Sequence, residues 1–111
     1  MQDFDELKNF ISKHSKFTDT AIDEIHIVNT NRKENIVMLI SSEYENYGVK
    51  ITFEDVVEMN LSHTQIFSIW ELDLEYKNDL YVFDPDPDPD PTFTEGGSIR
   101  IQCKKIQMIE L

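Results

Sequence analysis

The residues of this sequence with the clearest chemical potential are carboxylates, and most of them lie in one stretch. Between Ile51 and Glu95 there are twelve acidic residues against a single base, Lys77, so this stretch carries −11 of the chain's formal charge of −12. A surface of one sign attracts partners of the opposite sign and accelerates their encounter. The stretch therefore predicts either a binding surface for a basic protein or a solvated surface that keeps the chain in solution.

Four consecutive Asp-Pro pairs, residues 84–91, contain every proline of the chain. The aspartates of this repeat, together with the next acidic residue of the chain, match the first, third, fifth and twelfth places of an EF-hand calcium loop. In this sequence those places are Asp84, Asp86, Asp88 and Glu95. The sixth place of such a loop requires glycine, whereas Pro89 fixes φ near about −65°. The EF-hand is therefore excluded, and a looser calcium site on the same oxygens stays open as an alternative.

The Asp-Pro repeat itself indicates a loop in polyproline-II form, because proline lacks a ladder donor and biases its predecessor towards extended geometry. In that form alternate aspartates, up to Asp90, stand about 6 Å apart, near the spacing of phosphates on one nucleic-acid strand. They spiral about the axis, so any phosphate mimicry is approximate. The simpler interpretation is a solvated spacer.

The clearest alternation in the chain runs from Trp70 to Tyr76, where even positions are large and apolar and odd positions are all acidic. This pattern predicts a half-buried strand with Trp70 in the core and an acidic row facing water. We expect the acidic row and the aspartates of the loop to bind a partner, with Tyr44, Tyr47 and Phe93 as exposed aromatic anchors. The predicted partner-binding residues are Glu71, Asp73, Glu75, Asp84, Asp86, Asp88 and Asp90.

Signals for catalysis are missing from the sequence. The three histidines have no metal-ligand spacing with one another or with Cys103, which alternates with Ile99 and Ile101 as a small core residue would. The three glycines form neither a phosphate-binding loop nor a nucleophile elbow. We therefore expect a protein that is not an enzyme and needs no cofactor.

The elements that must position these residues are mostly strands, because the chain has 13 isoleucines and one alanine. One helix is predicted over residues 4–13, with Asp3 and Glu6 as a capping box. Alternating or apolar segments predict strands at 21–28, 36–40, 49–53, 57–61, 70–76, 80–83 and 98–103, with a last short strand from residue 106. The segments 49–53 and 57–61 are either two strands or one long bent strand, and 36–40 is apolar on both faces. The expected fold is α+β and mainly β: one N-terminal helix packed on six or seven antiparallel strands, as a sandwich or a partly open barrel.

Four motifs carry a resemblance to a known class of proteins. They are Asp19-x-x-Ile22-x-x-Ile25, Ile51-x-Phe53-x-x-Val56, the acidic alternating strand from Trp70, and Ile99-x-Ile101-x-Cys103-x-x-Ile106. Over residues 17–109 the chain resembles small bacterial α+β immunity proteins of polymorphic toxin systems. The resemblance implies a non-catalytic inhibitor that binds a cognate toxin, and the Asp-Pro loop departs from its pattern.

Length and charge limit the number of domains and the kinds of partner that this chain can have. A chain of 111 residues is expected to form a single domain, 1–111, with the Asp-Pro repeat as a loop insertion. Its acidity disfavours nucleic acid and anionic membranes as partners, and its longest apolar run is far too short to span a bilayer. The lone cysteine and the polar N-terminus favour the cytoplasm. The sequence thus predicts an immunity-type inhibitor of a basic toxin, with a calcium-binding module or a structural interaction domain as alternatives, and carries no signal for a particular oligomeric state.

Overall fold

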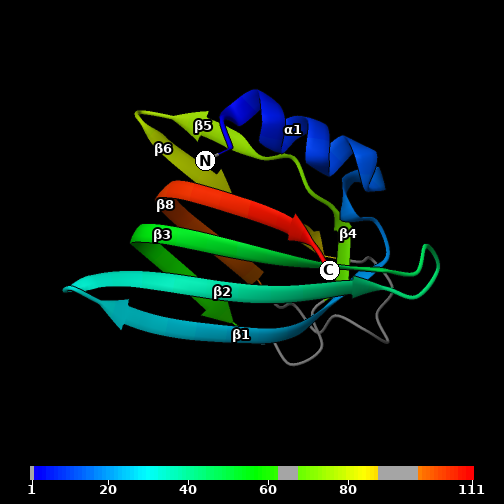
Figure 1. Cartoon of the computed structure of the whole chain (residues 1–111), viewed down its shortest axis with the longest axis horizontal. Coiled ribbons are helices and arrows are strands. Elements are labelled where there is room, and N and C mark those ends of the chain that lie inside the picture. The colour runs from blue at the N-terminus through cyan, green and yellow to red at the C-terminus, as the bar shows by residue number, and fades with distance from the viewer. Residues whose placement is uncertain (1, 63–67, 88–97) are drawn as a thin grey trace.

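The computed structural model describes residues 2–62, 68–87 and 98–111. Figure 1 shows a helix beside a strongly curved sheet. The helical elements are α1 (Phe4–Lys13) and a single 3₁₀ turn, η1 (Ser15–Phe17). The strands are β1 (Thr20–Thr30), β2 (Lys33–Ser42), β3 (Tyr47–Ser62), β4 (Ser68–Glu71), β5 (Glu75–Lys77), β6 (Leu80–Phe83), β7 (Asp86–Pro87) and β8 (Ser98–Glu110).

All eight strands belong to one antiparallel sheet in the order β5-β6-β8-β3-β2-β1-β4-β7. The sheet curls into a half-barrel, because β3 and β8 cross the front of the molecule and turn back behind it (Figure 1). The predicted fold class, one N-terminal helix on a mainly antiparallel β structure, is confirmed. Of the two predicted architectures, the partly open barrel is the one that forms.

Helix α1 begins and ends where its sequence predicts. The Asp3 carboxylate accepts a hydrogen bond from the Glu6 backbone N–H at 2.8 Å, and the Glu6 side chain accepts one from the Asp3 N–H at 3.4 Å. Leu7 and Ile11 on its inner face are buried against the sheet. No helix within the described ranges has the length and apolarity that a bilayer crossing requires.

Two tight hairpins set the register of neighbouring strands. Asn31 and Arg32 join β1 to β2, and Asn78 and Asp79 join β5 to β6. All four residues have φ between 52° and 64°. Positive φ at both central residues defines a type I′ turn, whose twist matches that of the flanking strands.

The sheet bends at a corner where β3 and β8 change direction together. Asp55 has φ of 55°, and side chains facing the core switch there from Phe53 to the partly buried Val56. Segments 49–53 and 57–61 are thus one bent strand, and a bulge next to Val56 leaves Val57 55% exposed rather than inward. The predicted separate strand from residue 106 is wrong, because β8 runs unbroken through the same corner.

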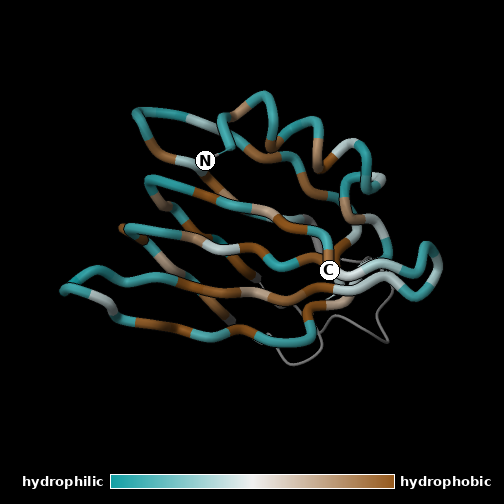
Figure 2. Tube along the Cα trace, in the orientation of Figure 1, coloured by the Kyte–Doolittle hydropathy of each residue, from teal (hydrophilic) through white to brown (hydrophobic). Residues whose placement is uncertain are grey.

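The core lies inside this corner, between the front and rear halves of the sheet. Phe53 and Phe83 meet edge to face there with ring centroids 5.0 Å apart. Apolar residues alternate with hydrophilic ones along β3 and β8, and the hairpin tips are hydrophilic (Figure 2). Segment 36–40 is apolar on both faces, as a strand buried on two sides would be, but the outward residues Val37 and Leu39 of β2 are only half-buried.

Candidate functional site

The structure places the predicted acidic residues on the short strands at the two ends of the sheet order. Glu71 ends β4, Asp73 lies in the connection to β5, Glu75 begins β5, and Asp84 follows β6. We call these four residues the acidic face. In the backbone pairing of β4 with β7, Asp86 lies opposite Glu71. Asp88, Asp90, Phe93 and Glu95 lie outside the described residues.

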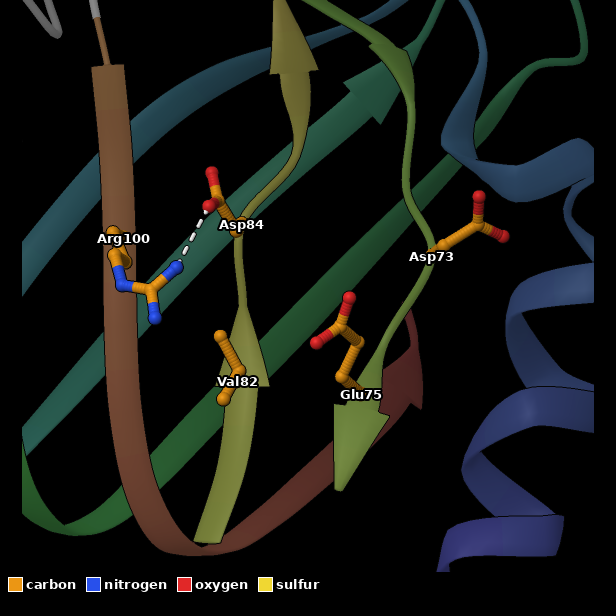
Figure 3. A pocket seen from close by; sticks show the side chains of 5 residues that line it. All are labelled: Asp73, Glu75, Val82, Asp84 and Arg100. Carbon is orange, nitrogen blue, oxygen red and sulfur yellow. Dashed lines mark hydrogen bonds and ion pairs between the residues drawn. The ribbon is translucent and has the colours of Figure 1, made fainter. Parts of the chain in front are cut away.

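Three members of the acidic face line one surface hollow of about 310 Å³. The lining residues are Asp73, Glu75, Val82, Asp84 and Arg100. They come from β5, β6, β8 and the connection before β5, so strand pairing, not sequence proximity, assembles the hollow (Figure 3). The structure therefore joins the predicted acidic strand to the start of the Asp-Pro segment.

The carboxylates around the hollow point in different directions. Asp84 faces Arg100 across the opening, with its Oδ2 accepting a hydrogen bond from the guanidinium at 3.0 Å. Glu75 turns its carboxylate into the hollow, whereas Asp73 turns away from Asp84 and Arg100 (Figure 3). The carboxylate that points into the opening is therefore that of Glu75, which is itself paired with Lys77.

Three bases balance much of the charge of this face, and two of them, Lys16 and Arg100, lie outside the acidic stretch of the sequence. Lys16 reaches Glu71 at 3.0 Å and Asp73 at 3.4 Å. The hydrogen bond to Glu71 and the charge of Asp73 raise the pKa of Lys16 above its usual value. Arg100 also pairs with Glu58 at 3.5 Å, and Lys77 pairs with Glu75 at 2.8 Å. Five carboxylates and three bases thus leave a local charge of −2.

Lys16 reaches the acidic face because η1 bends the chain sharply after α1. Lys16 has φ of 54°, and its carbonyl accepts a hydrogen bond from the Leu72 N–H at 2.9 Å. Nothing in the local sequence predicted this meeting of segments 56 positions apart. Arg100 was easier to anticipate, since it lies between the inward Ile99 and Ile101 and must therefore point outward.

The prediction that Trp70 is a core residue is wrong. The pairing of β4 with β7 is irregular at this position, so the neighbouring Ile69 is fully buried while Trp70 is 45% exposed. Alternation resumes with Leu72 and Leu74 inward, and Tyr76 at the end of the segment is 44% exposed. The acidic segment is therefore bounded by two exposed aromatic side chains, a residue type enriched at protein interfaces.

The predicted aromatic anchors differ in their surroundings. Tyr44 is 87% exposed. Tyr47 is half-buried and donates its hydroxyl hydrogen to the His14 carbonyl at 3.1 Å. Burial, followed by the charges of Glu45 and Glu110, raises the pKa of Tyr47 to about 12. Tyr47 is thus part of the fold, and Tyr44 is the one of the two that is free for a partner.

His14 occupies a buried position that its sequence context did not indicate. Its Nδ1 lies 2.8 Å from the Phe10 carbonyl oxygen, and its Nε2 lies 2.8 Å from a carboxylate oxygen of Glu110. The ring stacks on Phe10 with centroids 4.3 Å apart. These contacts tie the C-terminal end of α1 to the end of β8, which is a structural role.

The described residues contain no group of three or more side chains placed to hold a metal ion. Of the residues in the calcium alternative, Asp84 is engaged by Arg100, and Asp88 and Glu95 lie outside the described ranges. Burial raises the pKa of the Cys103 thiol to about 12, so the thiolate needed for nucleophilic chemistry does not form near neutral pH. The arrangement of the acidic face is suited to binding cationic groups. The chain matches no model of a known protein family and no curated protein sequence.

Proposed function

We propose that this protein is a non-catalytic binding protein of the cytoplasm, an immunity-type inhibitor whose acidic face docks on a basic toxin. The observation that carries the proposal is the hollow, where Asp73, Glu75 and Asp84 from separate segments line one opening and Glu75 points into it. Its anionic lining fits the ammonium or guanidinium group of a partner's lysine or arginine.

The internal ion pairs are compatible with this role. Lys16, Glu71 and Asp73 are between 36% and 71% exposed, so solvent screens their ion pairs and keeps them weak. A partner's arginine that binds a carboxylate in two-point fashion can displace such a pair. Until then, the pairs hold the carboxylates in place and reduce the entropy lost on binding.

Exposed aromatic residues beside the acidic face supply the apolar part of an interface. Trp70 and Tyr76 are each nearly half exposed at the two ends of the acidic segment. Buried aromatic anchors dominate the energy of many interfaces, while charges set the rate and specificity of association. We therefore expect Trp70 to contribute to the lifetime of the complex and the acidic face to its rate of formation.

The test uses the product of the gene adjacent to this one, which for an immunity protein encodes the toxin. Association with that protein is measured by stopped flow across a salt series, for the native chain and for the triple variant Glu71→Gln, Asp73→Asn, Glu75→Gln. We expect the variant to associate about ten-fold more slowly at low salt, with a weaker dependence on salt. An unchanged rate would show that the acidic face is not part of the interface.

A matched control removes the same number of charges elsewhere. The variant Asp5→Asn, Glu34→Gln, Glu43→Gln changes the net charge equally and should slow association much less, because steering depends on where the charge lies. A further variant, Arg100→Gln, removes the base inside the hollow and should speed association. Calcium at millimolar concentration should leave the melting temperature unchanged, whereas a calcium-binding module would be stabilised.

A further inference from the structure

The outer edge of β1 is a long strand edge that the described part of the molecule leaves open. β1 pairs with β2 along its length but with β4 only at Thr20 and Ala21. Among the described residues, positions 22–30 thus have no strand on their other side. An uncovered edge is a template for another strand, and proteins usually shorten, cover or charge such edges.

Other edges of this sheet carry such protection. The front half of β8 is covered by α1 and by Gln2, which precedes the helix, accepts a hydrogen bond from the Met108 N–H and donates one to the Met108 carbonyl. The terminal strands β5 and β7 have three and two residues. β1 has eleven residues, no proline and no lysine, and its one bulge, between Ile22 and Glu24, lies at the end next to β4. Positions 25–30 are therefore a regular edge that is neither short nor blocked by these devices.

The turn between β1 and β2 fixes which backbone groups face outward. A two-residue type I′ turn makes its flanking residues, Thr30 and Lys33, a hydrogen-bonded pair. Alternation along an antiparallel ladder then directs the N–H and carbonyl groups of Ile25, Ile27 and Asn29 away from β2. These three residues present an evenly spaced row of donors and acceptors.

Apolar side chains lie at the middle of this edge. Ile27 is 51% exposed and Val28 is 43% exposed, on opposite faces of the sheet. A strand placed alongside β1 would cover part of both side chains. The open edge therefore offers apolar burial as well as backbone hydrogen bonds.

Charges along β1 and its turn into β2 are arranged so that the edge of one copy is complementary to the edge of a second copy in antiparallel orientation. Asp23 and Glu24 lie near the end at β4, where Glu24 is 3.1 Å from His26 Nε2. Arg32 and Lys33 lie at the hairpin tip before Glu34, and Lys33 pairs with Asp55 at 3.5 Å, so Arg32 is the base that a second copy meets. Antiparallel pairing of two copies brings the acidic end of each against the basic tip of the other. A generic cationic strand would instead be repelled by the tip, so the charge pattern favours a second copy.

We propose that two copies of this chain associate through β1, antiparallel about a two-fold axis at Ile27, and form one continuous sheet. Ile27 then faces Ile27 of the second copy, and Ile25 faces Asn29, which gives about six backbone hydrogen bonds. Glu24 comes one diagonal step from Arg32 of the second copy, within reach of long side chains. The hairpin tip of the second copy ends opposite Asp23. It therefore stops before Ala21, where the pairing of β1 with β4 begins.

The net charge of −12 on each copy opposes association at long range. Salt screens that repulsion while leaving the backbone pairing intact. The dimer should therefore strengthen as salt is added, whereas binding of a basic toxin to the acidic face should weaken. Dimerisation does not rest on the proposed function, and the opposite salt dependence keeps the two tests separate.

The experiment is sedimentation equilibrium of the full chain over a concentration series at low and high salt. We expect a monomer–dimer equilibrium that the variant Ile27→Lys weakens by about ten-fold or more, since like charges then meet at the axis. The matched control is Val57→Lys, at a comparably exposed valine on β3, which should leave the equilibrium unchanged. A monomer at every concentration and salt, or a dimer that Ile27→Lys does not weaken, would overturn the proposal.

Charge exchange supplies a second, independent readout. Glu24→Arg and Arg32→Glu should each weaken the dimer, and the two changes together should restore it, because the diagonal pair is re-formed with reversed signs. Amide exchange by NMR should slow at Ile25, Ile27 and Asn29 as concentration rises. No rescue by the double variant, with exchange at these amides independent of concentration, would place any dimer interface elsewhere.

Discussion

The Gln2 side chain hydrogen-bonds the edge of β8 as a neighbouring strand would. Its substitution should therefore cost more stability than its position near the end of the chain suggests. The Met108 N–H donates to Gln2 Oε1 at 2.6 Å, and Gln2 Nε2 donates to the Met108 carbonyl at 3.0 Å. Met108 is only 2% exposed, so Gln2→Ala leaves two largely buried backbone groups without their partner. Each such group costs about 1–3 kcal/mol. Because some water can reach the edge, we expect a loss of about 2 kcal/mol in the free energy of unfolding, from a total of about 5–15 kcal/mol for a domain of this size.

The variant Gln2→Glu separates hydrogen bonding from packing, because it keeps the size of the side chain. At neutral pH it replaces the Nε2 donor with a carboxylate oxygen facing the Met108 carbonyl, so it should destabilise at least as much as Gln2→Ala. A protonated carboxyl can donate again, so folding raises the pKa of the introduced group above the unfolded value of about 4.3. The stability deficit is therefore smallest below about pH 4 and grows as pH rises through the raised pKa.

Urea denaturation at pH 7 and at about pH 4 measures both effects as changes in midpoint at constant slope. The control is Gln107→Ala, at an exposed position on the same strand, which should change stability by less than about 0.5 kcal/mol. If Gln2→Ala and Gln2→Glu both behave like the control, the side chain does not cover the edge of β8 and the reasoning fails.

Three further outcomes follow from particular positions. Asp79→Gly should stabilise the chain by about 0.5–1 kcal/mol in thermal denaturation, because Asn78-Gly relieves a φ of 63° in a type I′ turn; a lower melting temperature would contradict this. Phe53→Ala should destabilise by about 3–5 kcal/mol in urea, and the exposed Val57→Ala by less than about 0.5; similar losses would show that the corner is not the centre of the core. Cys103 should react with a thiol reagent at pH 8 only on unfolding, since burial raises its pKa to about 12; rapid reaction of the native chain would refute that burial.

Elements governed by neighbours in the chain were predictable, the helix with accurate bounds and β3 by its inward face. The predicted single strand 70–76 is wrong, because residues 72–74 connect β4 to β5 outside any strand. The capping box at Asp3 and Glu6 placed helix 4–13, and the alternation at residues 49–53 placed the inward face of β3, because each depends on groups a few residues apart. The corner at Asp55 could not be predicted in the same way. It depends on β3 and β8 bending together, and the sequence left one strand or two as equal alternatives.

The candidate site shows the same division. The outward positions of Asp73 and Glu75 followed from alternation with Leu72 and Leu74. The outward position of Trp70 did not, because it arises from an irregular pairing with β7, a strand that the Asp-Pro repeat predicted to be loop. Local periodicity describes a face only as far as the ladder stays regular.

The sequence alone determined that this chain is a mainly β domain with one capped helix and with its negative charge concentrated in one stretch. These properties depend on composition, on period-two alternation and on contacts within one turn. Only the tertiary structure decided how much of that charge is free, because Lys16 meets Glu71 across 55 positions and Arg100 meets Asp84 across 16. Which charges neutralise one another depends on strand order and curvature, so a stretch that reads as −11 along the chain becomes an acidic face whose carboxylates are paired with Lys16, Lys77 and Arg100.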